Sequence, residues 1–233
     1  MNLRMLAAFA APLALVALLT AAQDAKPAAA PVAKSADAEV IAYQKACYPL
    51  TTCPISHEAL GKDSVDTLID GRLVRTCCAN CVAGAEKGKA DIFKAIDAAV
   101  ITQQKAAYPL EKCPISGEAL PKDAVDFVWG TRLVRFCCND CVGAFKKDPS
   151  ATLKKLDDAY IAAQKPNYPL DTCVISGEKI GADPKMETVD LLYGTHYFKL
   201  CCGGCVKAVK KDPAAAWAKV EAARAAKAGE KKG

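Results

Sequence analysis

The stretch RLVRFCCNDC at Arg132–Cys141 decides the fold, because it occurs in three versions along the chain. The other two versions are RLVRTCCANC at Arg72–Cys81 and HYFKLCCGGC at His196–Cys205. In each version a short apolar run typical of a strand leads into three cysteines, and the residues that follow are typical of the first turns of a helix. We therefore predict that each copy places its thiols at a junction between a strand and a helix.

A further cysteine precedes each copy, introduced by Tyr-Pro-Leu and followed closely by Ile-Ser. These lone cysteines recur at intervals of 60 residues, at Cys53, Cys113 and Cys173. The segment before Tyr-Pro-Leu favours a helix, which the proline ends. Two apolar runs then flank a turn containing glycine, such as Asp70-Gly71, which indicates a β-hairpin. Each repeat is therefore predicted to consist of a helix, a lone cysteine, a hairpin, the cysteine cluster and a second helix.

This pattern predicts an α+β protein of three tandem small modules joined by helices. Asp-Pro pairs, such as Asp148-Pro149, indicate the start of a joining helix, here expected over residues 150–164. The expected organisation is a signal peptide at 1–22, a flexible linker at 23–36, repeats at 37–96, 97–156 and 157–228, and a disordered tail at 229–233.

Composition and the N-terminal segment indicate an exported protein. Arg4 followed by an apolar run and then small residues has the layout of a secretory signal peptide, with an uncleaved membrane anchor as the alternative. We therefore expect a periplasmic or secreted protein without a membrane association after cleavage. The net charge of +5 over 233 residues is too small to favour nucleic-acid binding.

The cysteine pattern favours metal binding. Cysteines three or four positions apart, such as Cys78 and Cys81 or Cys77 and Cys81, lie on one side of a helical turn, where the helix dipole favours thiolates. A module of ~60 residues is near the size at which a hydrophobic core alone is marginal, so a metal or a cross-link would stabilise it. A hairpin followed by a helix, with cysteines before and after the hairpin, is the plan of small zinc-supported domains such as the treble clef.

The second repeat also resembles a known family. Cys113-Pro-Ile-Ser-Gly-Glu, Gly130, Val134-Arg-Phe-Cys-Cys-Asn-Asp-Cys141, Phe145 and Asp148-Pro149 are similar to the TRASH and YHS group of heavy-metal-binding domains. The resemblance extends to all three repeats. It implies a role in metal sensing, trafficking or resistance, with a metal-trafficking or efflux protein as partner. It also implies three ligands per site: Cys53, Cys77 and Cys81; Cys113, Cys137 and Cys141; and Cys173, Cys201 and Cys205.

The middle cysteine of each cluster leaves two alternatives open. Cys78, Cys138 and Cys202 could complete four-thiolate sites, which suit Zn²⁺ or Cu⁺ with up to one ion per repeat. They could equally remain spare thiols that pass a metal on. Together with the nine residues above they make twelve candidate metal ligands.

Two rival interpretations use the same cysteines. Structural disulfides would make the protein an interaction array, and the CxxC spacing of Cys202 and Cys205 could indicate a thiol–disulfide redox protein. No arrangement of residues typical of an enzyme active site is present, so we predict no enzyme activity.

Several single residues are expected to have ordinary structural roles. Cys47, outside the repeated pattern, is expected to be a lone surface or semi-buried thiol. His57 and His196 are expected to be polar surface residues, and Trp129 and Trp217 to lie in cores or junctions. The recurring carboxylates are expected to make cap or turn contacts rather than metal bonds: Glu58, Glu118, Glu178, Asp66, Asp126 and Asp190.

Overall fold

The computed structural model describes residues 35–230. The predicted signal peptide at 1–22 and residues 23–34 of the predicted linker therefore lie outside the described residues, as does the end of the predicted tail. Helix α1 (Ser35–Lys45) begins inside the expected linker, and helix α7 (Pro213–Glu230) continues into the expected tail. No helix within 35–230 has the length and apolar character needed to cross a membrane.

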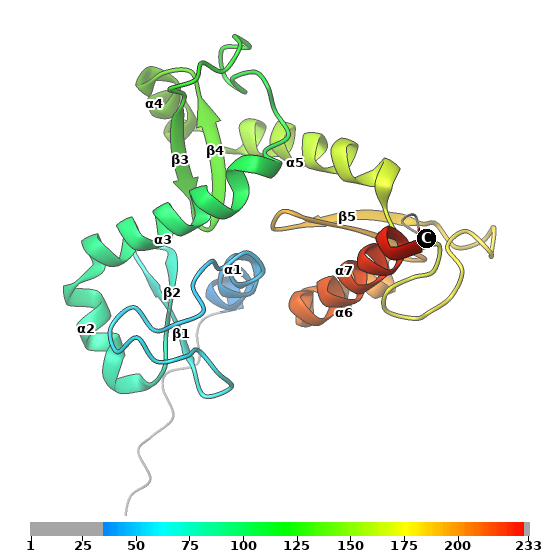
Figure 1. Ribbon diagram of the computed structural model, residues 1–233, viewed down its shortest axis with the longest axis horizontal. Coiled ribbons are helices and arrows are strands. Elements are labelled where there is room, and N and C mark those ends of the chain that lie inside the picture. The colour runs from blue at the N-terminus through cyan, green and yellow to red at the C-terminus, as the bar shows by residue number, and fades with distance from the viewer. Residues whose placement is uncertain (1–34, 231–233) are drawn as a thin grey trace, which may run out of the picture. The chain divides into compact units, whose positions relative to one another are not determined.

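The described chain is a mixed α+β fold in which three antiparallel hairpins are each followed by a helix (Figure 1). The hairpins are β1 (Val65–Ile69) with β2 (Arg72–Thr76), β3 (Val125–Trp129) with β4 (Arg132–Phe136), and β5 (Val189–Tyr193) with β6 (His196–Leu200). The remaining helices are α2 (Val82–Lys87), α3 (Lys89–Gln104), α4 (Asn139–Lys147), α5 (Ser150–Gln164) and α6 (Gly204–Lys211). The sequence prediction of three hairpin-and-helix modules is thereby confirmed, whereas their identity as treble clefs stays a prediction.

Tight two-residue turns close the hairpins. Ile69 pairs with Arg72 across the first turn, so Asp70 and Gly71 alone connect the strands. Both residues have left-handed backbone angles, with φ of 49° and 76°, which is the conformation that an Asp-Gly hairpin turn requires. Gly130 and Gly194 begin the other two turns with φ of 63° and 65°.

A glutamine near the end of each preceding helix fixes that helix to its hairpin. The Gln104 side chain donates from Nε2 to the carbonyl of Thr131 at 2.8 Å and accepts from the N–H of Leu133 at 2.9 Å. Gln44 and Gln164 make the same pair of bonds to the first and third hairpins. The repeat in sequence is therefore also a repeat in side-chain contacts.

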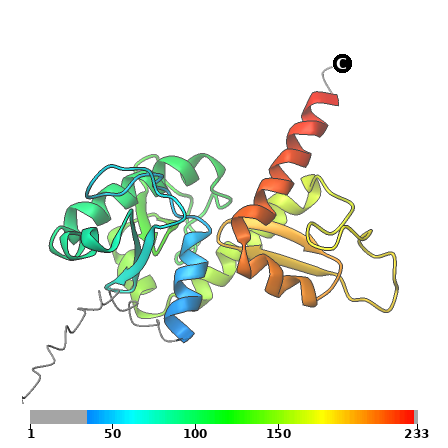
Figure 2. The same ribbon diagram turned by 90° about the horizontal axis from the view of Figure 1, so that it is seen from below.

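Helix α3 belongs to two modules at once. Its buried Ile96 and Val100 lie in one hydrophobic core with Val74 of the first hairpin and Leu133 of the second. The predicted repeat boundary after residue 96 therefore falls inside a helix that both modules share. Helix α5 in turn contributes Leu156 to the core of the second module. Helix α7, red in Figures 1 and 2, packs in the third core.

The first helix contacts the turns of the other two hairpins as well as its own. Thr131 donates from Oγ1 to the carbonyl of Gln44 at 2.8 Å, and Arg132 donates from Nη1 to the Tyr43 hydroxyl at 2.8 Å. The half-buried Cys47 sulfur accepts from the N–H of Thr195 at 3.2 Å. These contacts connect the three modules around the C-terminal end of α1, and they give Cys47 a structural role.

Candidate metal centres

The lone cysteine of each module lies in a compact turn before the hairpin. In the second module the N–H of Cys113 donates to the carbonyl of Glu118 at 2.7 Å, and the N–H of Gly117 donates back to the carbonyl of Cys113 at 2.9 Å. Gly117 has a φ of 77°, and in the first module His57 holds the equivalent position at 62°. The turn buries the lone cysteine almost completely and points its sulfur toward the cluster that follows the hairpin.

The cluster begins directly after the second strand of each hairpin. Cys137 follows β4, Cys138 has an extended backbone with φ of −156°, and Cys141 lies in the first turn of α4. The change from strand to helix within these five residues turns the first and last sulfurs toward each other. The Cys137 and Cys141 sulfurs are 3.7 Å apart, and the equivalent pairs in the other two modules have the same separation.

Three sulfurs therefore converge in every module. All ligand atoms within each group lie within 4.8 Å of one another. The groups are Cys53, Cys77 and Cys81; Cys113, Cys137 and Cys141; and Cys173, Cys201 and Cys205. These are the three triads that the family resemblance implies.

The spacing of these sulfurs fits a metal ion. Sulfurs each about 2.3 Å from a tetrahedral zinc ion are about 3.8 Å apart, which is close to the observed 3.7 Å. It is far from the roughly 2.05 Å of a disulfide bond, and all thirteen cysteines, which lie within the described residues, are free. An all-sulfur donor set suits Zn²⁺, Cu⁺ and other thiophilic ions. The arrangement can therefore hold one metal ion per module.

The middle cysteine lies at the edge of each triad. The Cys78 sulfur is 3.8 Å from that of Cys77 and 3.9 Å from that of Cys81, and Cys202 repeats this geometry within 0.1 Å in the third module. In the second module the Cys138 sulfur lies 3.8 Å from the Cys137 sulfur. Cys78 and Cys138 are exposed, unlike the buried lone cysteines.

The lone cysteine has the lowest pKa of each triad, because the pKa values of the other two thiols are raised. Burial of Cys53 opposes its ionisation, but backbone N–H groups of Ser56 and Cys77 donate to its sulfur and lower its pKa to about 6. The pKa values of Cys113 and Cys173 are lowered to about 6 for the same reason. A metal ion therefore meets one ready thiolate in each module and displaces protons from the other thiols.

A serine supports each cluster. The Ser56 hydroxyl lies 3.2 Å from the Cys77 sulfur, and Ser116 and Ser176 contact Cys137 and Cys201 at 3.3 and 3.4 Å. A hydroxyl that donates to a metal-bound thiolate orients it and offsets its charge. Sequence reasoning did not assign this role, although the recurrence of Ile-Ser after every lone cysteine was a signal for it.

The histidines do not join the triads. His57 is exposed and serves the turn through its left-handed backbone. His196 stacks on Trp217 with 4.1 Å between ring centroids, and burial followed by the charge of Arg224 lowers its pKa to about 4. His196 is therefore not a ligand, as expected, but it is half-buried rather than a fully exposed surface residue, because an aromatic neighbour covers one face of its ring.

The recurring aspartates make ion pairs rather than cap or turn contacts, which corrects the expectation for them. Asp126 accepts from Arg135 across the hairpin at 2.7 Å and from Lys105 of the preceding segment at 2.7 Å. Asp66 and Asp190 occupy the same position in the other hairpins. The carboxylates of Glu58 and Glu178 do make the expected turn contact, because they accept from the hydroxyls of Ser56 and Ser176 at 3.5 and 3.4 Å. For Glu118 the turn contact is made by its backbone carbonyl, which accepts from the N–H of Cys113.

Trp129 contacts Phe145 edge to face but remains 40% exposed, so it is not a core residue. The alternative of a junction position stays a prediction.

No family model, curated protein or solved structure matches this chain.

Proposed function

We propose that this protein is an exported metal-binding protein that holds one thiophilic metal ion, Zn²⁺ or Cu⁺, in each of its three modules. The observation that carries this proposal is the convergence of three cysteine sulfurs in every module, with 3.7 Å between the first and last sulfurs of each cluster. The same convergence of sulfurs in all three modules is hard to explain by packing alone, because thiols are weak hydrogen-bonding groups.

The roles that follow are metal buffering, delivery or resistance outside the cytoplasm. The resemblance of the repeats to TRASH and YHS domains supports this group of roles, and the signal-peptide layout of residues 1–22 supports export. A metal-trafficking or efflux protein is the corresponding partner.

We further propose that the middle cysteine of each cluster is the fourth ligand. In the first and third modules its sulfur lies 3.8–3.9 Å from two members of the triad, which matches the edge of a four-sulfur tetrahedron. Cobalt substitution tests this, because the sulfur-to-cobalt charge-transfer absorption grows with the number of thiolates. Replacing Cys138 with serine is expected to reduce that absorption by about a quarter of one site's share, and an unchanged spectrum would leave Cys138 as a spare thiol.

The central experiment measures metal content and free thiols. Mature protein comprising residues 23–233 is purified from the exported fraction without added reductant, and its metal is determined by elemental analysis. We expect about three equivalents of zinc or copper, with the cluster thiols recovered after chelation. A metal-free protein with only one free thiol would instead establish the disulfide-stapled array.

A double variant tests the assignment of residues. Cys137→Ser with Cys141→Ser is expected to lower the metal content from about three equivalents to two. Cys47→Ala is the matched control, since Cys47 lies outside the triads and the second repeat has Ala107 at the equivalent position. Unchanged metal content in the double variant would refute the site.

A further inference from the structure

The three candidate sites have the same ligands but different surroundings. In the third module Cys201 and Cys205 are buried, at 2% and 8% exposure, and in the second module Cys141 is 8% exposed. In the first module Cys77 and Cys81 are both only half-buried. The hydrophobic cores of the second and third modules include their cysteine ligands, whereas the core that contains the first hairpin includes none.

One cause lies in the helix that follows each cluster. Phe145 of α4 and Val209 of α6 are fully buried under the second and third clusters. The equivalent residue in α2 is Ala85, which fills far less space. The first cluster consequently has less apolar packing beside it.

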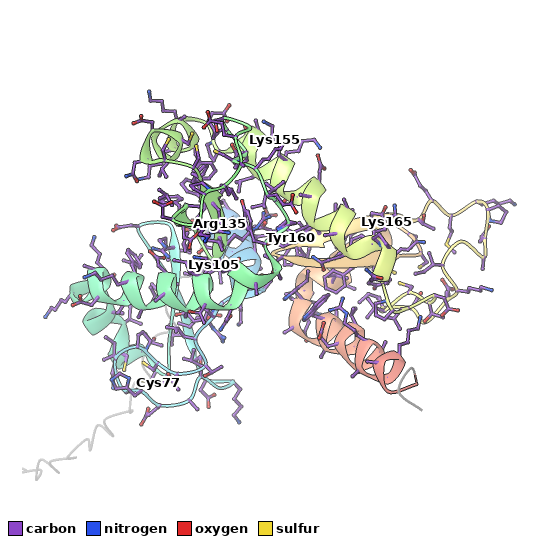
Figure 3. All side chains as sticks on the ribbon, turned by 45° about the horizontal axis from the view of Figure 1, so that its top comes forward. Cys77, Lys105, Arg135, Lys155, Tyr160 and Lys165 are labelled. Atoms are coloured by element: carbon purple, nitrogen blue, oxygen red, sulfur yellow. The ribbon has the colours of Figure 1, made fainter. Side chains whose placement is uncertain are left out.

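A second cause is a lysine on the next long helix. Lys155 of α5 donates from Nζ to the carbonyl of Pro114 at 2.9 Å, and Lys219 of α7 donates to the carbonyl of Val174 at 3.1 Å. Each carbonyl belongs to the residue directly after a lone cysteine. Figure 3 labels Lys155 on α5 beside the second module. Within residues 35–230, neither lysine forms an ion pair with a carboxylate.

The first module has no counterpart to this lysine. The equivalent position on α3 is Ala95, which directly precedes Ile96 as Lys155 precedes Leu156. In the described part of the chain, no side chain donates to the carbonyl of Pro54, which is only half-buried.

The lysine matters because a thiolate site is anionic. Three or four thiolates around a divalent ion leave a net charge of about −1 or −2. A nearby ammonium group offsets that charge, and its hydrogen bond also holds the turn whose N–H groups point at the lone sulfur. Burial strengthens both effects and restricts the approach of a competing ligand.

We propose that the three sites form a graded set, in which the site of Cys53, Cys77 and Cys81 is the labile exchange site and the other two retain their metal. This inference rests on the proposed function. Lys155 and Lys219 act as positioning residues, since they contact the turn that holds a ligand rather than the metal. A competing thiolate or chelator therefore takes metal first from the first module.

Metal release from the full mature chain tests this inference. Residues 23–233 are loaded with Zn²⁺ and mixed with an excess of the colorimetric chelator 4-(2-pyridylazo)resorcinol, and zinc transfer is followed over time. We expect one equivalent of Zn²⁺ to be released at least about tenfold faster than the other two. About tenfold is the lower end of the effect that follows when a metal ligand loses an outer-shell contact. Cys77→Ser with Cys81→Ser is expected to remove the fast phase.

Two lysine variants then separate the effect of the lysine, through its charge and its hydrogen bond to the turn, from the effect of how deeply the cysteines are buried. Ala95→Lys is expected to slow the fast phase, and Lys155→Met is expected to move one equivalent from the slow to the fast phase. Lys154→Met is the matched control, because Lys154 is the neighbouring residue on α5 but pairs with Asp158 at 2.9 Å. The control is expected to leave every phase unchanged.

The outcomes distinguish this inference from the proposed function. Three equivalents of Zn²⁺ released in a single phase would overturn the graded set and leave metal binding intact. A fast and a slow phase that both Ala95→Lys and Lys155→Met leave unaffected would overturn the role of the lysine. Binding of fewer than three equivalents would count against the proposed function and this inference together.

Discussion

Replacing Gln104 with alanine is expected to loosen the second hairpin strongly. Gln104 is only 9% exposed, and its side chain satisfies the carbonyl of Thr131 and the N–H of Leu133 at 2.8 and 2.9 Å. The variant leaves both buried backbone groups without a partner. Each unsatisfied group costs about 1–3 kcal/mol, so we expect a combined loss of about 2–6 kcal/mol for the two groups.

Hydrogen exchange of the Leu133 amide in the metal-loaded protein measures this effect. A loss of about 2–6 kcal/mol corresponds to a fall in protection of roughly 30-fold to about 10⁴-fold. Thr102→Ala is the control, because the exposed Thr102 only donates to a carbonyl of its own helix at 2.8 Å. Gln164→Ala is expected to cost less, since its second bond, to Tyr197, is 3.3 Å long and only partly buried. A fall in protection of less than fivefold in the Gln104 variant would refute the conclusion that Gln104 fixes the helix to its hairpin.

Three further predictions concern single positions. Gly194→Ala is expected to lower the midpoint of thermal unfolding, because its Cβ would lie 2.4 Å from the Cys47 sulfur and its φ of +65° strains any side chain; adding Cys47→Ala should restore part of the loss, and no rescue would contradict the clash. Ser116→Ala is expected to weaken zinc binding at the second site about tenfold in competition with a chelator, since the Cys137 sulfur loses its hydroxyl partner; equal affinity would remove that role. In reduced, metal-free protein, thiolate absorbance at 240 nm should rise as the pH passes through about 6, because N–H donors stabilise the ionised form of the lone thiols, and a first rise above pH 8 would contradict this for Cys53, Cys113 and Cys173.

The local elements were largely predictable from the sequence. Asp70-Gly71 between apolar runs predicted the first hairpin because that dipeptide adopts the left-handed angles that the turn needs. The predicted helix at 150–164 is observed as α5 with the same bounds, because Asp148-Pro149 marks its start and its pattern has no breaker. In both cases the deciding signal lies within a few residues of the element it specifies.

Contacts between modules were not predictable in the same way. Thr131 bonds to the carbonyl of Gln44, 87 residues earlier, and Cys47 bonds to Thr195, 148 residues later. No local sequence pattern indicates which hairpin turn contacts which helix. Cys47 therefore looked like a residue without a partner, although it joins the first helix to the third hairpin.

The candidate ligands were readable from the sequence, but the groups that distinguish the sites were not. The cysteines of the triads recur at similar positions in each repeat, so their spacing in the sequence indicated the sites. Lys155 reaches the second site from α5, 41 residues after the carbonyl that it binds, and nothing in the cysteine motif refers to it. Spacing within a motif identifies ligands, whereas the charge and packing around them come from elements that fold back onto the site.

The missing lysine at the first site is a difference in site chemistry rather than a consequence of packing. Helix α3 serves two modules, and its inward positions, such as Ile96 and Gln104, are fixed by contacts with both hairpins. Ala95 is exposed on that helix, so no neighbour prevents a longer side chain there. Lysine at this position would also cost little helix propensity relative to alanine. The fold therefore permits a lysine beside all three sites. The chain nevertheless lacks this ammonium group at the first site.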